Sequence, residues 1–223
     1  MKRYEQAIGI VYIPIHSAAL PFLLSFIFIL FNSEPSTSYF SLLCYSISFL
    51  FILATMFRFL RASFSDLIQE FWRAVQALIL GYVLYRVLLW VVALLIAQLV
   101  QQVTNPNQDA IVSDIASNFR VMIVVTVLLA PIVEEATIRG ALFGTIRQKS
   151  RVTAYIVTAL VFSFFHLWDH LIFDFQWETL YALVQYIPAS IALSWCYERG
   201  GTIWSPILLH AVINLLGALQ IGG

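Results

Sequence analysis

Residues 121–143 read VMIVVTVLLAPIVEEATIRGALF, an apolar stretch with two adjacent glutamates and an arginine in its second half. A helix needs about 20 mostly apolar residues to cross the hydrocarbon core of a bilayer, so this stretch predicts a membrane span. Ionisable side chains inside a span are costly and are functional candidates by default. Glu134, Glu135 and Arg139 are therefore the first candidates for a functional site.

The rest of the chain has a similarly apolar composition. Of its 223 residues, 61% are hydrophobic and 11% are charged, and the mean hydropathy is +0.88. A soluble domain carries about 25% charged residues, so this composition excludes an ordinary water-soluble domain, a disordered chain and a nucleic-acid binder. The net charge is zero and indicates no partner. Cys44 and Cys196 are too few for a disulfide framework and lack the spacing of metal ligands.

We therefore expect an all-α fold, a polytopic transmembrane helical bundle with about seven spans. Residues 64–75 are amphipathic and are predicted to lie at the membrane interface before the third span. The last two spans are short, so six or eight crossings remain open. We expect one integral membrane domain, with N-terminal transmembrane helices and the amphipathic segment in 1–118 and a functional helical core in 119–223. The predicted spans are Ile8–Phe31, Phe40–Phe57, Ala77–Val100, Val121–Phe143, Thr153–Phe173, Thr179–Cys196 and Ile203–Leu219.

The distribution of basic residues predicts the orientation. Cytoplasmic loops carry an excess of Lys and Arg, and placing the N terminus inside puts nearly all of the Lys and Arg residues outside the spans on that side. Arg120, at the start of the fourth span, is the exception. The prediction is N-in and C-out. The basic residues assigned to the inside are Lys2, Arg3, Arg58, Arg61, Arg73, Arg147, Lys149, Arg151 and Arg199.

The two glutamates of the fourth span are expected to serve different partners. Neighbouring residues on a helix point about 100° apart. Glu135 and Arg139 stand at i, i+4, the spacing of a helical ion pair. That pairing leaves Glu134 with no partner in its own helix, although a purely structural polar cluster remains an alternative.

Two later spans add polar groups. The fifth contains His166, and the seventh contains His210 and Asn214, which share one helix face at i, i+4. A carboxylate, two imidazoles and a carboxamide can together activate a water and stabilise an oxyanion. Alternatively, Glu134, His166 and His210 could bind zinc. No His-Glu-x-x-His motif is present, so the chain is not a typical zincin.

These motifs carry a resemblance to a known family. Glu134-Glu135-x-x-x-Arg139, Phe162-x-x-x-His166 and His210-x-x-x-Asn214 resemble the three motifs of the CAAX-processing and bacteriocin-processing (CPBP, or Abi) intramembrane protease family. Ala130-Pro131, Arg139-Gly140 and Trp204-Ser205-Pro206 flank them as in that family. The resemblance covers about residues 120–216 and makes 119–223 a CPBP-type catalytic core. No family signature is visible in the first three spans.

The resemblance implies an intramembrane endopeptidase that hydrolyses peptide bonds of membrane-associated peptides or proteins. Glu134 would be the general base and would work with His166 on a water. His210 and Asn214 would donate hydrogen bonds to the tetrahedral oxyanion.

Supporting roles are implied for residues around these four. Glu135 and Arg139 would lock the orientation of the fourth helix. Phe162 would pack one turn before His166 and restrict its rotamer. Pro131 removes a helical hydrogen bond just before the acidic pair, which would help to admit water.

The family has been described both as glutamate-dependent and as metal-dependent. We favour no metal and no other cofactor, because two donors on one helix face explain the pairing of His210 with Asn214. If zinc is bound, its ligands would be Glu134, His166 and His210.

Two non-catalytic alternatives remain open, a membrane transporter and an immunity scaffold. The polar residues lie in one half of the chain without a visible repeat, which disfavours a transporter. The expected partners are membrane lipids and a peptide or membrane-protein substrate, with no nucleic acid. The expected location is a bacterial cell membrane, and the oligomeric state is open.

Overall fold

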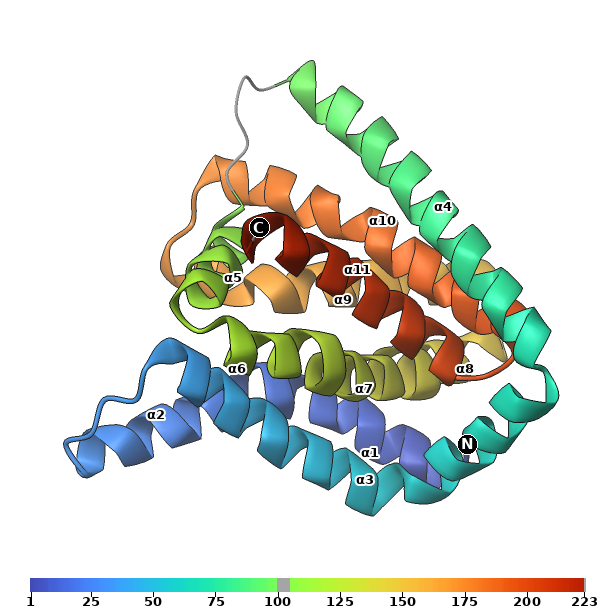
Figure 1. Cartoon of the computed structure of the whole chain (residues 1–223), viewed down its shortest axis with the longest axis horizontal. Helices are drawn as coiled ribbons and strands as arrows, with labels where there is room; N and C mark the ends of the chain where they lie inside the picture. The colour runs from blue at the N-terminus through green and yellow to red at the C-terminus, as the bar shows by residue number, and fades with distance from the viewer. Residues whose placement is uncertain (100–104, 223) are drawn as a thin grey trace.

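The computed structural model describes residues 1–99 and 105–222, and this part of the chain is helical with no strand (Figure 1). The all-α prediction is confirmed. Three short segments, η1 to η3, are π-helical. The elements are α1 (Arg3–Pro14), η1 (Ile15–Ala19), α2 (Leu20–Leu30), α3 (Thr37–Gln69), α4 (Phe71–Ala97), α5 (Pro106–Ser117), α6 (Phe119–Ile123), η2 (Val124–Leu129), α7 (Ala130–Glu135), η3 (Ala136–Phe143), α8 (Gly144–Arg147), α9 (Arg151–Phe173), α10 (Trp177–Gly200) and α11 (Trp204–Gly222).

Six helical stretches in the described residues are long and apolar enough to cross a membrane, and a shorter apolar helix spans Trp204–Gln220. These seven stretches coincide with the seven predicted spans, although their ends differ. The chain is an integral membrane protein. Its orientation in the membrane stays a prediction, and the predicted end of the third span at Val100 lies outside the described residues.

The largest difference from the predicted boundaries is in α3. The apolar run predicts a helix over Phe40–Phe57, whereas α3 continues to Gln69. Backbone hydrogen bonding does not end where hydrophobicity ends, and no proline or glycine interrupts residues 58–69. The amphipathic segment 64–75 is thus the end of α3 and the start of α4, which meet at a corner at Glu70 (Figure 1).

The fourth stretch, residues 119–147, is the centre of the bundle. In its most apolar window 67% of the residues are buried, against 6% in the first stretch and 11% in α4. Helices α1 and α3 pack along one side of it, and α9 and α11 pack along others (Figure 1). The central helix is therefore enclosed by protein, while the first stretch and α4 present most of their surface outward.

The N-terminal helices and the later helices share one hydrophobic core. Tyr12 and Met56 cluster with Val133 and Ala136 of the central helix. Gly9 permits the close contact, because a Cβ atom there would lie 2.5 Å from Cβ of Ala141. Residues from the first half of the chain consequently reach the central helix where it carries the acidic pair.

Candidate active site

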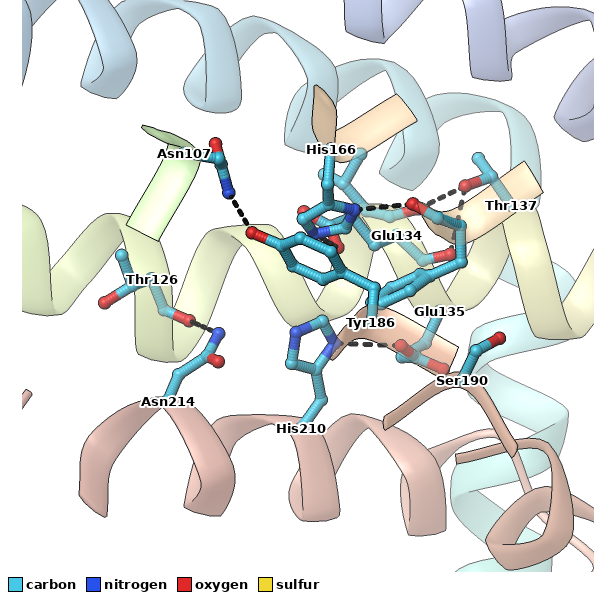
Figure 2. Close-up of polar contacts among 12 residues, drawn as sticks. Asn107, Thr126, Glu134, Glu135, Thr137, His166, Tyr186, Ser190, His210 and Asn214 are labelled. Carbon is cyan, nitrogen blue, oxygen red and sulfur yellow. Dashed lines mark hydrogen bonds and ion pairs between the residues drawn. The ribbon is translucent and has the colours of Figure 1, made fainter. Parts of the chain in front are cut away.

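The three sequence motifs converge inside the bundle. Glu134 lies on α7, His166 on α9, and His210 and Asn214 on α11 (Figure 2). The predicted catalytic side chains therefore approach one another from three separate helices.

Glu134 and His166 face each other. Nδ1 of His166 lies 2.7 Å from the carbonyl oxygen of Phe162. A carbonyl oxygen can only accept, so Nδ1 carries the proton and Nε2 of the neutral ring carries a lone pair. That Nε2 lies 3.8 Å from Oε2 of Glu134, a buried atom with no hydrogen-bond partner among the described residues. Two acceptors thus point at one another across a gap too wide for a direct hydrogen bond.

The other oxygen of Glu134 is held by a residue that the sequence analysis did not single out. The hydroxyl of Tyr45, on α3, donates to Oε1 of Glu134 over 2.9 Å. The two residues are 89 positions apart, and a tyrosine in an apolar span carries no signal of its own. Only the folded structure shows this contact.

Glu135 occupies a separate, closed environment. It pairs with Arg139 at 3.1 Å, as the spacing predicts, and both side chains have no exposed surface. It also lies 2.8 Å from Nδ1 of His210, a contact that spacing could not predict. Arg139 bonds further to the carbonyl and the hydroxyl of Ser190. These buried charges are therefore paired with each other, as burial requires, although Oε2 of Glu135 and Nε of Arg139 have no hydrogen-bond partner among the described residues.

Phe162 contacts two members of the site. Its ring lies 4.3 Å from that of His166, so the predicted packing between these residues is present. The guanidinium of Arg139 stacks over the same ring at 4.6 Å. Phe162 thus links the buried ion pair to His166.

Asn214 is anchored by a break in the central helix. In the π-turn η2, the N–H of Ala130 bonds to the carbonyl of Val125, one residue further back than in an α-helix. In this register the carbonyl of Thr126 would take its hydrogen bond from residue 131, but Pro131 has no N–H. Nδ2 of Asn214 donates to that carbonyl instead, over 2.7 Å.

His210 and Asn214 project from the same face of α11, as expected (Figure 2). Each already has one polar partner, Glu135 for His210 and Thr126 for Asn214. One N–H of the Asn214 amide and Nε2 of His210 remain for other contacts.

Tyr186 of α10 connects the start of helix α5 to the site. The Tyr186 ring packs 4.6 Å from the ring of His166. Asn107, in the first turn of α5, donates to its hydroxyl over 2.7 Å, and that hydroxyl lies 3.3 Å from Oδ1 of Asn105 (Figure 2). The start of α5 is thus tied to an aromatic ring that covers His166.

The candidate zinc ligands do not fit one ion in this geometry. Within residues 1–99 and 105–222, no group of three or more His, Cys, Asp or Glu side chains is arranged to hold a metal. Glu134 and His166 approach each other, and the contact of Nδ1 of His210 with Glu135 leaves its Nε2 free, but the three side chains are not grouped around one ion.

Comparison with known proteins finds a match over the second half of the chain. The family model described as type II CAAX prenyl endopeptidase Rce1-like matches residues 116–216. Residues 116–216 are thus similar to this family. The Rce1-like region contains all seven predicted site residues and leaves Tyr45 outside, and the resemblance predicted over about 120–216 is confirmed.

A curated relative matches a similar length of chain. The UPF0177 protein YaiF of Lactococcus lactis subsp. lactis (strain IL1403) is 35% identical over 92 residues, 40% of this chain and 35% of the relative. The chain thus spans about a third of the length of that relative. No solved structure matches.

Proposed function

We propose that this protein is an intramembrane endopeptidase that hydrolyses peptide bonds of membrane-associated peptides or proteins. The observation that carries the proposal is the facing pair of acceptors, Oε2 of Glu134 and Nε2 of His166, 3.8 Å apart. The match of residues 116–216 to a family named for a prenyl endopeptidase supports the same reaction class.

A water molecule satisfies both acceptors at once. It has two O–H donors, and it can bond to Glu134 and to His166 from a position beside the line that joins them. Both of its lone pairs then point away, toward a carbonyl carbon. Glu134 takes one proton as the water oxygen attacks, which is general-base catalysis by a positioned carboxylate.

The negative charge that develops on the substrate oxygen needs donors. Nε2 of His210 and the free N–H of Asn214 project from one helix face and can supply two. Nε2 of His210 can donate a hydrogen bond only when it carries a proton. That requires the Glu135–His210 pair to hold one proton more than it holds when Glu135 is a carboxylate and His210 is neutral with its proton on Nδ1. Glu135 orients the ring, since it lies 2.8 Å from Nδ1 of His210. Donors preorganised in a poorly solvated site are worth more than in water.

The reaction closes with the same groups. The tetrahedral intermediate collapses, the carbon–nitrogen bond breaks, and the proton held by Glu134 passes to the leaving amine. The products are a carboxyl terminus and a free amine, so one water is consumed for each bond cleaved.

Three alternatives make different predictions. A zinc-dependent protease would use the same residues and would lose activity on chelation. A transporter would move a solute without breaking bonds, and an immunity scaffold would do neither. We place the protein in a bacterial cell membrane with lipids as its surroundings.

The test is hydrolysis by the full chain reconstituted in liposomes. The probe is a mixture of synthetic peptides, with and without a lipid anchor, incubated in water enriched in oxygen-18. We expect fragments whose new carboxyl terminus carries the label, as read by mass spectrometry. Absence of cleavage across the mixture, with Glu134→Gln indistinguishable from the wild type, would contradict the proposal.

A further inference from the structure

We propose that Tyr45 is a positioning residue of this active site, so that the N-terminal helices outside the matched region complete the catalytic machinery. The inference rests on the proposed function. It assigns Tyr45 the task of holding Glu134 so that Oε2 alone faces His166.

The two oxygens of Glu134 have different surroundings. Oε1 accepts from the Tyr45 hydroxyl at 2.9 Å, and Oε2 is buried without a partner and faces Nε2 of His166. Rotation of the carboxylate about its last bond would exchange the two oxygens. The hydrogen bond from Tyr45 opposes that rotation, because it would be broken as the group turns. A phenol at this point therefore holds the carboxylate in an orientation in which one oxygen faces the water.

Tyr45 is itself held in place by neighbouring side chains. Its ring meets the ring of His16 edge-on, with centroids 4.9 Å apart. Nδ1 of His16 lies 2.8 Å from the hydroxyl of Ser48, and Tyr12 donates to the same hydroxyl over 3.1 Å. Four polar side chains from α1, η1 and α3 thus contact one another next to Glu134. They are Tyr12, His16, Tyr45 and Ser48.

His16 reaches this position from a π-helical turn. It lies in the π-helical segment η1, directly after Pro14. A π-turn is rare and often marks a functional site, because it rotates the following side chains relative to an α-helix. His16 lies outside the three sequence motifs. In the structure it contacts the residue that holds the candidate base.

A purely structural role for Tyr45 predicts different results. Phe51 already packs on Tyr12, with ring centroids 4.1 Å apart, and Ser48 already bonds to both Tyr12 and His16. These contacts do not need the Tyr45 hydroxyl. Its removal should therefore leave the packing of α1 on α3 intact while it releases Glu134.

The test compares Tyr45→Phe with Tyr39→Phe, a matched change at an exposed tyrosine on the same helix. The first readout needs no substrate. The infrared carboxylate bands of Glu134 are isolated as the difference between the wild type and Glu134→Gln in liposomes. We expect these bands to shift in Tyr45→Phe and to stay in Tyr39→Phe.

The second readout is turnover of whichever peptide of the synthetic mixture the wild type cleaves. We expect kcat of Tyr45→Phe to fall ~10- to 100-fold, the scale of a misplaced catalytic group, with KM and melting temperature unchanged. Unmoved carboxylate bands would overturn the inference, and so would unchanged kcat or a kcat loss that only parallels a loss of melting temperature. The proposed function would survive those outcomes as long as Glu134→Gln stays inactive.

Discussion

Nε2 of His166 lies 3.8 Å from Oε2 of Glu134, and neither atom brings a hydrogen to the contact when the histidine is neutral. This relationship leads to the first prediction. Glu134→Gln keeps the shape of the side chain and can still accept from Tyr45, but it cannot take a proton. We expect turnover to fall by at least ~100-fold, the scale of general-base loss, with the melting temperature retained. Near-normal turnover of labelled peptides would rule out Glu134 as the base, and Glu34→Gln serves as the control.

The second prediction concerns Glu135. Glu135→Gln removes the negative charge that faces both Arg139 and His210 in a fully buried position. Breaking a buried pair on one side costs about 3–5 kcal/mol, because a charge is left without compensation. We expect a large drop in the melting temperature in detergent, together with loss of activity.

The control for this change is Glu198→Gln. Glu198 pairs with Arg147 and Arg151, whose side chains are 48% and 62% exposed. Water can replace the lost partner there, so the melting temperature should change far less. Equal losses in the two variants would show that burial does not set the cost.

The third prediction concerns Pro131. Pro131→Ala restores an N–H that can bond to the carbonyl of Thr126 and compete with Asn214. We expect kcat to fall, by no more than the loss caused by Asn214→Ala, which removes an oxyanion donor and costs about 10²- to 10³-fold. Peptide hydrolysis by both variants checks this, with Pro21→Ala on α2 as the control. Full activity in Pro131→Ala would separate the π-turn from the placement of Asn214.

The fourth prediction concerns orientation. Single cysteines near Glu34, Asn107 and Asp174 and at Gly222 should react with an impermeant reagent from outside, and one at Lys149 should not. The native Cys44 and Cys196 are buried, which keeps the background low. Labelling at Lys149 from outside would contradict the predicted orientation.

The fifth prediction concerns metal. We expect metal-depleted protein to retain peptide hydrolysis, because Glu134 and His166 can act on water directly. Elemental analysis combined with activity after chelation measures this. Stoichiometric zinc, with activity lost on its removal and regained on its return, would reverse the choice and leave the residues unchanged.

Local spacing explains what the sequence could predict. Glu135 and Arg139 pair because i, i+4 places them on one helix face. Hydropathy located all seven apolar stretches, and the three motifs located the helices that meet. Contacts between residues far apart in the chain were missed, since Tyr45–Glu134 and His210–Glu135 depend on how the helices pack.

The π-turns mark a second limit. Pro131 predicts a lost hydrogen bond, but not the shift of register that leaves the carbonyl of Thr126 to Asn214. In the shifted register the carbonyl of Thr126 accepts a hydrogen bond from Asn214 of α11, and the sequence of the central helix does not predict this partner. The predicted end of α3 was also too early. The apolar run ends at the first arginines, whereas the helix continues to Gln69.

The enclosure of residues 119–147 also bears on how the protein is made. A helix with Glu134, Glu135 and Arg139 near its middle enters lipid poorly, since a charge at the centre of a span costs about 2.5–3.5 kcal/mol on insertion scales. During synthesis, α1 and α3 emerge before this helix, and α9 and α11 emerge after it. The early helices therefore offer it a protein neighbour as it leaves the translocon. The helices that no family signature marks are thus already made when the helix that carries the signature needs packing partners.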